Sequence, residues 1–207
     1  MSKPIVKMYG LPRSGTNALA SMMEKHMGVE IGGSCKHGWK HGLVIDTGIP
    51  SIGIVKDPYA WWVSVWRWRT TQNPLPFNQW VRKSSDPVLW CLMHQHWLDK
   101  GITFVRFEDL LVQPQQVMAK VSKATGIEIR SEVVRPQGVV NKARQETDKV
   151  FNVAHYLKRK YMDIYTVNAL RCFGERVDIP MVEKMGYEYL VNPEVESKLK
   201  WKKSRKP

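Results

Sequence analysis

The feature that most constrains the fold of this chain is a glycine-bearing loop between a short apolar strand and a helix. The run Ile5–Tyr9 predicts a buried strand, and Asn17–Met27 carries apolar residues at helical spacing. The loop between them reads Gly10-Leu11-Pro12-Arg13-Ser14-Gly15-Thr16, and its glycines allow the backbone to approach a ligand closely. Such a loop directs its amides and the positive end of the helix at one place, which predicts an anion site.

The loop has the glycine spacing of the phosphate loop in nucleoside triphosphatases, but it lacks the lysine of that loop. Thr16 follows Gly15 directly, where the motif has a lysine that reaches the β and γ phosphates. No obvious apolar strand ends in a magnesium-binding aspartate, for which Asp57 and Asp109 are the only candidates. The loop therefore favours a phosphate-type ligand over a triphosphate with magnesium. By itself it is equally compatible with a tight strand-to-helix turn.

Strands and helices alternate along the rest of the chain. Further strands are predicted at Ser51–Val55 and Ile102–Phe107, with a short one at Leu43–Ile45. Further helices are predicted at Tyr59–Thr70, Asp86–Asp99, from Pro114 to a stop at Gly126, Phe151–Tyr165, Val167–Phe173 and Pro180–Met185. This order predicts a three-layer α/β/α fold, in which helices cover both faces of a parallel sheet and the C-terminal part is helical. We expect one domain, residues 1–190, and a basic tail, residues 191–207.

Composition and charge narrow the classes of function. Lys and Arg number 32 against 19 Asp and Glu, a net charge of +13, which favours anionic ligands. A hydrophobic share of 43% indicates a globular chain. No uninterrupted apolar run of about 18 residues is present, so no membrane span is expected. The start lacks an apolar signal segment and the cysteines are few and scattered, which favours a cytoplasmic protein.

A second anion-binding element follows the strand Ser51–Val55. Lys56-Asp57-Pro58 ends that strand, and Ser64 lies eight residues after Lys56, nearly two turns into a helix that begins at Pro58. Open parallel sheets bind ligands at the edge where strands end, so Lys56 is expected at that edge. A cation and a hydroxyl at this spacing predict a second phosphate site, separate from the first.

With both elements in view, the chain resembles the sulfotransferases that use 3'-phosphoadenosine-5'-phosphosulfate (PAPS). Their loop of type Pro-(Lys/Arg)-Ser-Gly-Thr is similar to residues 12–16, and their Arg-(Asp/Asn)-Pro with a later serine is similar to Lys56-Asp57-Pro58 and Ser64. Val105–Leu111 and a closing Lys184-Met185-Gly186-Tyr187 match further family segments. The resemblance covers roughly residues 5–127, with a weaker echo to 190.

The resemblance implies a sulfuryl transfer from PAPS to a hydroxyl or amine of a small-molecule or glycan acceptor. The expected donor-binding residues are Pro12, Arg13, Ser14, Gly15, Thr16, Asn17, Lys56 and Ser64. Arg13 would stabilise charge in the transfer but, unlike the lysine of the cytosolic branch, cannot easily give up a proton. Ala18 stands where that branch has an adenine-stacking tryptophan, so the adenine must stack on another residue.

The general base is expected between the first helix and the strand Ser51–Val55. The cytosolic branch carries its catalytic histidine there, close behind a lysine, and both His41 after Lys40 and His37 after Lys36 are similar. A histidine suits the role because its ordinary pKa is near 6.5. We prefer His41, because Gly42 and the following strand should fix it near the sheet edge. Golgi-type relatives use a glutamate, for which Glu24 and Glu30 are the alternatives.

Two rival functions remain open at the level of sequence. One is a divergent nucleotide kinase, which needs magnesium and a triphosphate, and the other is a non-catalytic basic module that binds nucleic acid or sulfated glycan. We expect no metal, because Cys91, His94 and His96 do not share one helix face. We also expect no nucleic-acid partner, because the aromatic residues follow apolar helix patterns.

Overall fold

The computed structural model of the chain describes residues 2–32, 40–71, 74–135, 138–140, 146–150 and 152–189. The first half contains β1 (Ile5–Tyr9), α1 (Thr16–Met27), β2 (Glu30–Gly32), β3 (Ser51–Val55), α2 (Pro58–Arg69), α3 (Phe77–Lys83), α4 (Asp86–Asp99) and β4 (Phe104–Arg106). The second half contains α5 (Phe107–Val112), α6 (Pro114–Thr125), β5 (Gly138–Val140), β6 (Glu146–Val150), α7 (Val153–Leu157), the 3-10 helix η1 (Lys160–Ile164), α8 (Val167–Gly174) and α9 (Ile179–Lys184). None of the helices in these ranges is long and apolar enough to cross a membrane.

The main sheet is parallel and has the strand order β2-β1-β3-β4. In the central pair, Lys7 lies opposite Ser51 and Tyr9 lies opposite Gly53. Because neighbouring strands run the same way, the carboxyl ends of β1, β3 and β4 lie at one edge of the sheet. The loop that begins at Gly10, the Lys56-Asp57 pair and the start of α5 therefore leave the sheet at the same edge.

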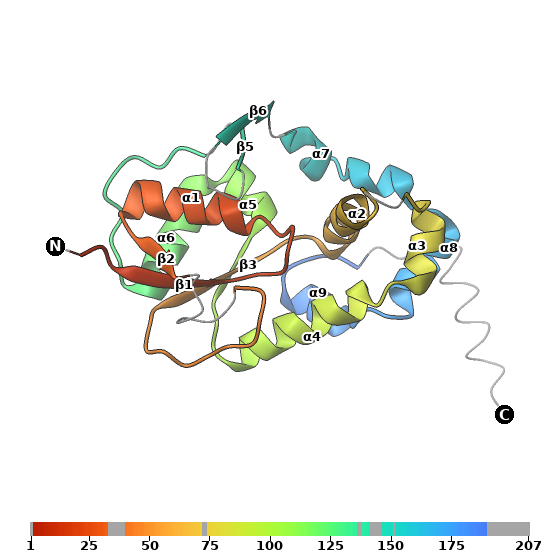
Figure 1. Cartoon of the computed structure of the whole chain (residues 1–207), viewed down its shortest axis with the longest axis horizontal. Helices are drawn as coiled ribbons and strands as arrows, with labels where there is room; N and C mark the ends of the chain where they lie inside the picture. Colours follow the sequence, from red (N-terminus) through yellow and green to blue (C-terminus); the bar gives the residue numbers. More distant parts are fainter. Residues whose placement is uncertain are drawn as a thin grey trace.

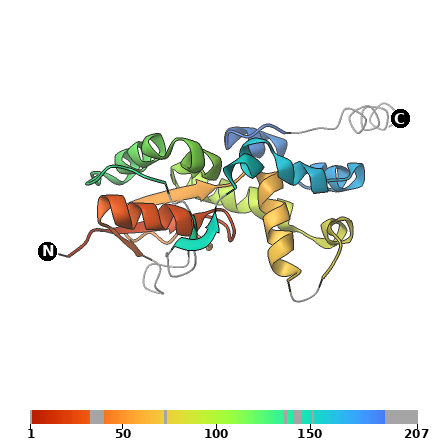
Figure 2. The ribbon, with the colours of Figure 1, turned by 90° about the horizontal axis from the view of Figure 1, so that it is seen from above.

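Helices cover both faces of this sheet, which confirms the predicted three-layer α/β/α fold (Figure 1). Successive strand side chains point to opposite faces, so Met8 and Ile54 pack into one core with α1, α5 and α6. Tyr9 and Val55 pack into the other core with α2, α4 and α9. Figure 2 shows α1 and α2 as separate helices on the two sides of the carboxyl edge.

Three of the predicted elements are wrong in detail. Leu43–Ile45 is not a strand, and Leu43 and Ile45 are exposed, so no apolar burial drives pairing there. The strand predicted at Ile102–Phe107 is shorter, because Phe107 already begins α5. The single helix predicted over Phe151–Tyr165 is two short ones, divided at Arg159, whose φ of 48° is left-handed.

Other elements were not predicted at all. Strand β2, which pairs with β1, lies in a segment for which no strand was predicted. Helix α3 follows Pro76, in a region without a helix prediction. The antiparallel pair β5 and β6 is a separate two-stranded sheet. These elements are only three to seven residues long, too short for a periodic sequence signal.

Helix α2 anchors the aromatic core on one face of the sheet. Trp61 and Trp62 are buried, whereas the Trp68 side chain near the end of the helix is 52% exposed. The Trp62 ring centroid lies 5.5 Å from that of Trp80 and 5.2 Å from that of Phe173. The burial of the tryptophans thus depends on their position in this helix. Trp61 and Trp62, in the first turns, are buried, and Trp68, in the last turn, is exposed.

Replacement of Trp62 by alanine should therefore test this packing. We expect Trp62→Ala to lower the free energy of unfolding by about 3–5 kcal/mol, because the removed ring leaves a cavity among other rings. The matched control on the same helix is Trp68→Ala, for which we expect a loss below about 1 kcal/mol. Urea unfolding followed by circular dichroism measures both, and equal losses would contradict the assignment of Trp62 to the core.

Candidate functional site

The loop after β1 is a strained turn that ends at the first residue of α1. Arg13 has a φ of 71° and Gly15 a φ of 95°, both in the left-handed region that non-glycine residues avoid. The hydroxyl of Ser14 donates to the carbonyl of Leu11 over 2.6 Å, and the Ser14 amide donates to the same carbonyl. Left-handed residues in such turns bring neighbouring amides to one side, where they bind anions. Gly15 precedes α1 without a side-chain cap, which leaves the first helical amides available to a ligand.

Neighbouring elements hold this loop tightly on several sides. The Trp61 indole nitrogen on α2 donates to the carbonyl of Pro12 over 2.7 Å. The Gly10 amide donates to the carbonyl of Lys40 over 3.1 Å. A Cβ on Gly10 would lie 2.8 Å from the carbonyl oxygen of Ile54, so no larger residue fits there without a shift of backbone. Packing and hydrogen bonds from these neighbours thus pre-organise the loop.

His41 lies against the beginning of the same loop. Its Nδ1 contacts the carbonyl oxygen of Gly10, and because a carbonyl only accepts, the proton of the neutral ring is on Nδ1 and the lone pair on Nε2. The neighbouring Lys40 ammonium donates to the Asn17 side chain on α1 over 3.0 Å. Burial lowers the pKa of His41, the Gly10 carbonyl opposes this, and the charge of Lys40 lowers the pKa further. The imidazole of His41 therefore stays neutral, as a general base must be, down to lower pH than an ordinary histidine side chain.

Lys56 is a buried cation at the end of β3, with 3% of its surface exposed. Its ammonium donates to the hydroxyl of Tyr156 on α7 over 3.3 Å. It also lies 4.6 Å from the ring centroid of Tyr156 and 5.0 Å from that of Phe107, which are cation–π distances. A buried ammonium needs compensating charge or hydrogen bonds, and these neutral partners supply only part of it. Lys56 is therefore well placed to take an anionic ligand.

Phe107 connects the loop after β1 with Lys56. A Cβ on Gly15 would clash with Cδ2 of Phe107, so the ring packs directly on the glycine. The same ring lies beneath the Lys56 ammonium. The predicted juxtaposition of the two elements at one edge of the sheet is thus present, with one aromatic side chain in contact with both.

A pair of buried carboxyl groups supports Lys56 from inside the protein. Asp57 caps α2, because its side chain accepts hydrogen bonds from the amides of Tyr59 and Ala60. Glu108 accepts from the Asp57 amide over 3.2 Å and from the Tyr187 hydroxyl over 2.7 Å. Burial raises the pKa of both groups, and the charge of Asp57 raises that of Glu108 further, while Tyr187 and Lys56 oppose the rise. This network fixes the backbone at Lys56.

The remaining residues singled out in the sequence fall into different places. Ser64 is half-buried on α2, and His37 lies outside the described residues. Glu30 pairs with Ile5 at the beginning of β1, which is the amino edge of the sheet, far from the loop at its carboxyl edge. It is therefore a poor alternative base. Glu24 lies two turns along α1.

The histidines set aside in the sequence analysis are structural. His94 is fully buried among Trp90, Trp97 and Phe104, and burial lowers its pKa to about 4. The Nε2 of His96 accepts from the Val44 amide and so holds the chain after His41. Within the described parts of the chain, no cluster of three or more metal-ligating side chains is present.

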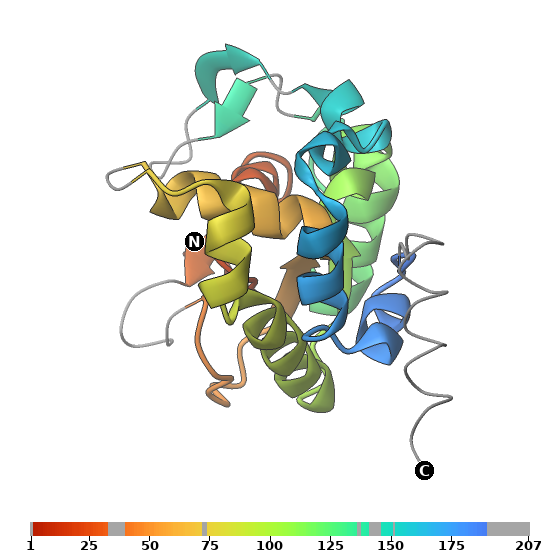
Figure 3. The same cartoon turned by 90° about the vertical axis from the view of Figure 1, so that its right-hand side faces the viewer.

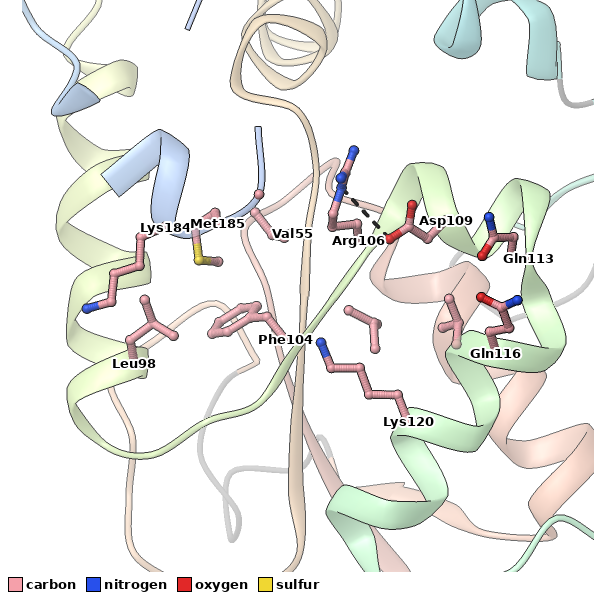
Figure 4. A pocket seen from close by; sticks show the side chains of 13 residues that line it. Val55, Leu98, Phe104, Arg106, Asp109, Gln113, Gln116, Lys120, Lys184 and Met185 are labelled. Atoms are coloured by element: carbon pink, nitrogen blue, oxygen red, sulfur yellow. Dashed lines mark ion pairs between the residues drawn. The ribbon is translucent and has the colours of Figure 1, made fainter. Parts of the chain in front are cut away.

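A cavity of about 510 Å³ lies on the outer side of β4, between α6 and the ends of α4 and α9 (Figure 4). Figure 4 shows Lys120 on one wall, Leu98 and Met185 on the other, and Phe104 between them. Arg106 and Asp109 form a long ion pair of 3.9 Å at one end. The cavity takes no lining from Gly10–Asn17 or from Lys56, so it is a separate feature that also carries cationic side chains.

Comparison with known proteins supports the fold. The structure of mouse sulfotransferase SULT7A1, crystallised in complex with PAP, matches 99% of this chain and 89% of its own chain, with a TM-score of 0.50 and 18% sequence identity. At this identity the likeness establishes the fold, a parallel sheet with flanking helices like that of a sulfotransferase. No protein-family model and no curated protein sequence matches the chain.

Several side chains around Lys56 were missed from the sequence. Phe107, Glu108 and Tyr187 belong to segments whose resemblance was noted without a role, and Tyr156 was not considered. They come from three different parts of the chain and meet only through packing. One of these side chains could have been identified from the sequence, because the acidic Glu108 follows a buried strand at the sheet edge where ligand sites form.

The buried carboxyl pair makes a prediction about stability and pH. Because the pKa of Glu108 is raised on folding, the folded state binds more protons than the unfolded state above pH 4.5, and this group's contribution to stability falls as pH rises. Glu108→Gln cannot ionise, so the stability of the variant relative to the wild type should increase from pH 4.5 to 7.5. Urea unfolding at four pH values measures this, and parallel pH profiles would contradict it.

Proposed function

We propose that the chain is a sulfotransferase that transfers a sulfuryl group from PAPS to a hydroxyl or amine of a small-molecule or glycan acceptor. The observation that carries the proposal is the contact of Phe107 with both Gly15 and Lys56. Through this contact the loop after β1 and Lys56, the two elements that we propose to bind the phosphates, lie at one sheet edge. Two such elements suit a nucleoside with a phosphate at each end. The sulfotransferase-like fold supports the proposal, because the matched mouse enzyme was crystallised with PAP.

The chemistry requires charge stabilisation at the 5' end of the donor. The acceptor oxygen or nitrogen bonds to sulfur while the bond from sulfur to the 5'-phosphate oxygen breaks, and negative charge grows on that oxygen. Arg13, Thr16 and the first amides of α1 are the groups proposed to stabilise it. Arg13 carries the permanent positive charge of this set, and its side chain is exposed at the loop.

The acceptor must lose a proton during the transfer, and we assign this step to His41. The lone pair on Nε2 takes the proton, and the resulting imidazolium is held at Nδ1 by the Gly10 carbonyl. The burial of His41 close to the loop fits this role better than either glutamate alternative. We propose Lys56 and Ser64 as the groups that bind the 3'-phosphate.

The binding proposal predicts the behaviour of a lysine variant. Lys56→Ala should weaken the binding of adenosine 3',5'-bisphosphate about 10- to 100-fold, because a charge-assisted hydrogen bond is lost in a buried site. Isothermal titration calorimetry measures the affinity. The matched control is Lys120→Ala, in the cavity outside β4, which should leave the affinity unchanged.

Two outcomes would contradict this assignment. If Lys120→Ala weakens binding and Lys56→Ala does not, the bisphosphate occupies the outer cavity. If only ATP with magnesium stabilises the wild type in a thermal shift assay, the protein is a kinase and not a sulfotransferase. If only polyanions stabilise it, the protein is a polyanion-binding module.

The base proposal predicts a separate kinetic effect. His41→Ala should lower kcat about 100-fold or more, because general-base catalysis contributes at least that factor, while the affinity for the bisphosphate stays the same. Because the pKa of His41 is lowered, the wild-type rate should stay on its plateau below pH 6.5 and fall only under more acidic conditions. Turnover with sulfur-35-labelled PAPS measures both. If His41→Ala is active and His37→Ala is inactive, the general base is His37 and not His41.

A further inference from the structure

The charges of Arg67, Lys56 and Lys160 all act on His155, which lies on α7. Ser64 and Arg67 lie three residues apart on α2 and therefore share one face of the helix. Helix α2 packs against η1, and α7 packs against both η1 and α5 (Figure 3). Arg67 on α2, His155 on α7 and Lys160 on η1 thus come from elements joined by the packing of η1 against the other two, and α7 reaches Lys56 through Tyr156.

Ring contacts place His155 beside the partners of Lys56. Its ring centroid lies 5.3 Å from that of Tyr156 and 5.9 Å from that of Tyr161. The Tyr156 hydroxyl accepts the hydrogen bond from Lys56, so His155 is one side chain removed from the Lys56 ammonium. His155 is half-buried and Arg67 is exposed, so both side chains are accessible to a ligand.

The positive charges around His155 repel one another, and few negative charges oppose them. Burial lowers the pKa of His155, and the charges of Arg67, Lys56 and Lys160 lower it further, while Asp163 on η1 opposes them. On α5, the charge of Glu108 interacts with that of Lys56 from inside the protein. Arg159 forms an ion pair with Glu188 over 3.1 Å and is engaged there. Concentrated positive charge of this kind favours a bound dianion.

We infer that Arg67 and His155 complete the 3'-phosphate site, and that they give the protein its selectivity for a 3'-phosphorylated nucleotide. This inference rests on the proposed function and adds residues that the sequence analysis did not consider. Arg67 presents a planar group whose paired N–H donors match two phosphate oxygens, a bidentate geometry that the ammonium of Lys56 lacks. His155 adds a positive charge when the bound phosphate causes it to take up a proton.

The role of His155 couples binding to protonation. Without a ligand its imidazole is neutral at pH 7, since its pKa lies below the ordinary value of 6.5. A phosphate dianion favours the imidazolium, so His155 takes up a proton on binding near pH 6. Affinity for the 3'-phosphate therefore gains a contribution at pH 6 that is absent at pH 8.

The experiment compares adenosine 3',5'-bisphosphate with adenosine 5'-phosphate, by isothermal titration calorimetry on the full chain. Arg67→Gln should reduce the preference for the bisphosphate about 10-fold or more at both pH 6 and pH 8. His155→Gln should reduce it at pH 6 only. Titrations in buffers of different ionisation enthalpy should show that the wild type takes up more protons than His155→Gln, a comparison that cancels protons exchanged by the phosphate itself.

Lys123→Gln, at an exposed position on α6, is the matched control for loss of one positive charge and should change neither preference. If the wild type prefers the bisphosphate but both Arg67→Gln and His155→Gln keep that preference, the inference is wrong and the proposed function stands. Equal proton uptake by the wild type and His155→Gln would overturn the role of His155. If the wild type does not distinguish the two nucleotides, the proposed function itself fails.

Discussion

The contact of one phenylalanine ring with a glycine and a lysine holds the candidate site together. Phe107 packs on Gly15, where the absence of a side chain makes room for the ring, and its face lies beneath the Lys56 ammonium. These residues follow β1, β3 and β4, three adjacent parallel strands. The arrangement of the strands brings the two cationic elements to one edge, and the ring fixes how they face each other.

Buried charge gives the site its electrostatic character. Lys56 is buried with neutral aromatic rings beside its ammonium, and its charge acts on the Glu108 carboxyl group. Desolvation raises the pKa of Glu108 and of Asp57, which opposes the ionisation of both carboxyl groups. A bound anion would add a partner for the buried lysine. Tyr187, near the end of the described chain, is tied into the same network through Glu108.

The sequence predicted the parts of the site that are continuous in the chain. The strand, glycine loop and helix from Ile5 to Met27 are local, and each residue type there restricts the backbone directly. Lys56 at the end of a strand was predicted for the same reason. The direction of the Ser14 hydroxyl toward Leu11, and the contact of His41 with Gly10, were not predictable, because both depend on how neighbouring segments pack.

The sequence by itself determined the fold class, the loop after β1, and the position of Lys56 at the end of a strand. It did so because apolar periodicity and glycine placement act over a few residues. Only the tertiary structure decided which side chains surround Lys56, since Tyr156, Arg67 and Glu108 are far apart in sequence and their meeting follows from helix packing on the sheet. Contacts of that kind leave no pattern in a single sequence, because each partner on its own is an ordinary surface or core residue.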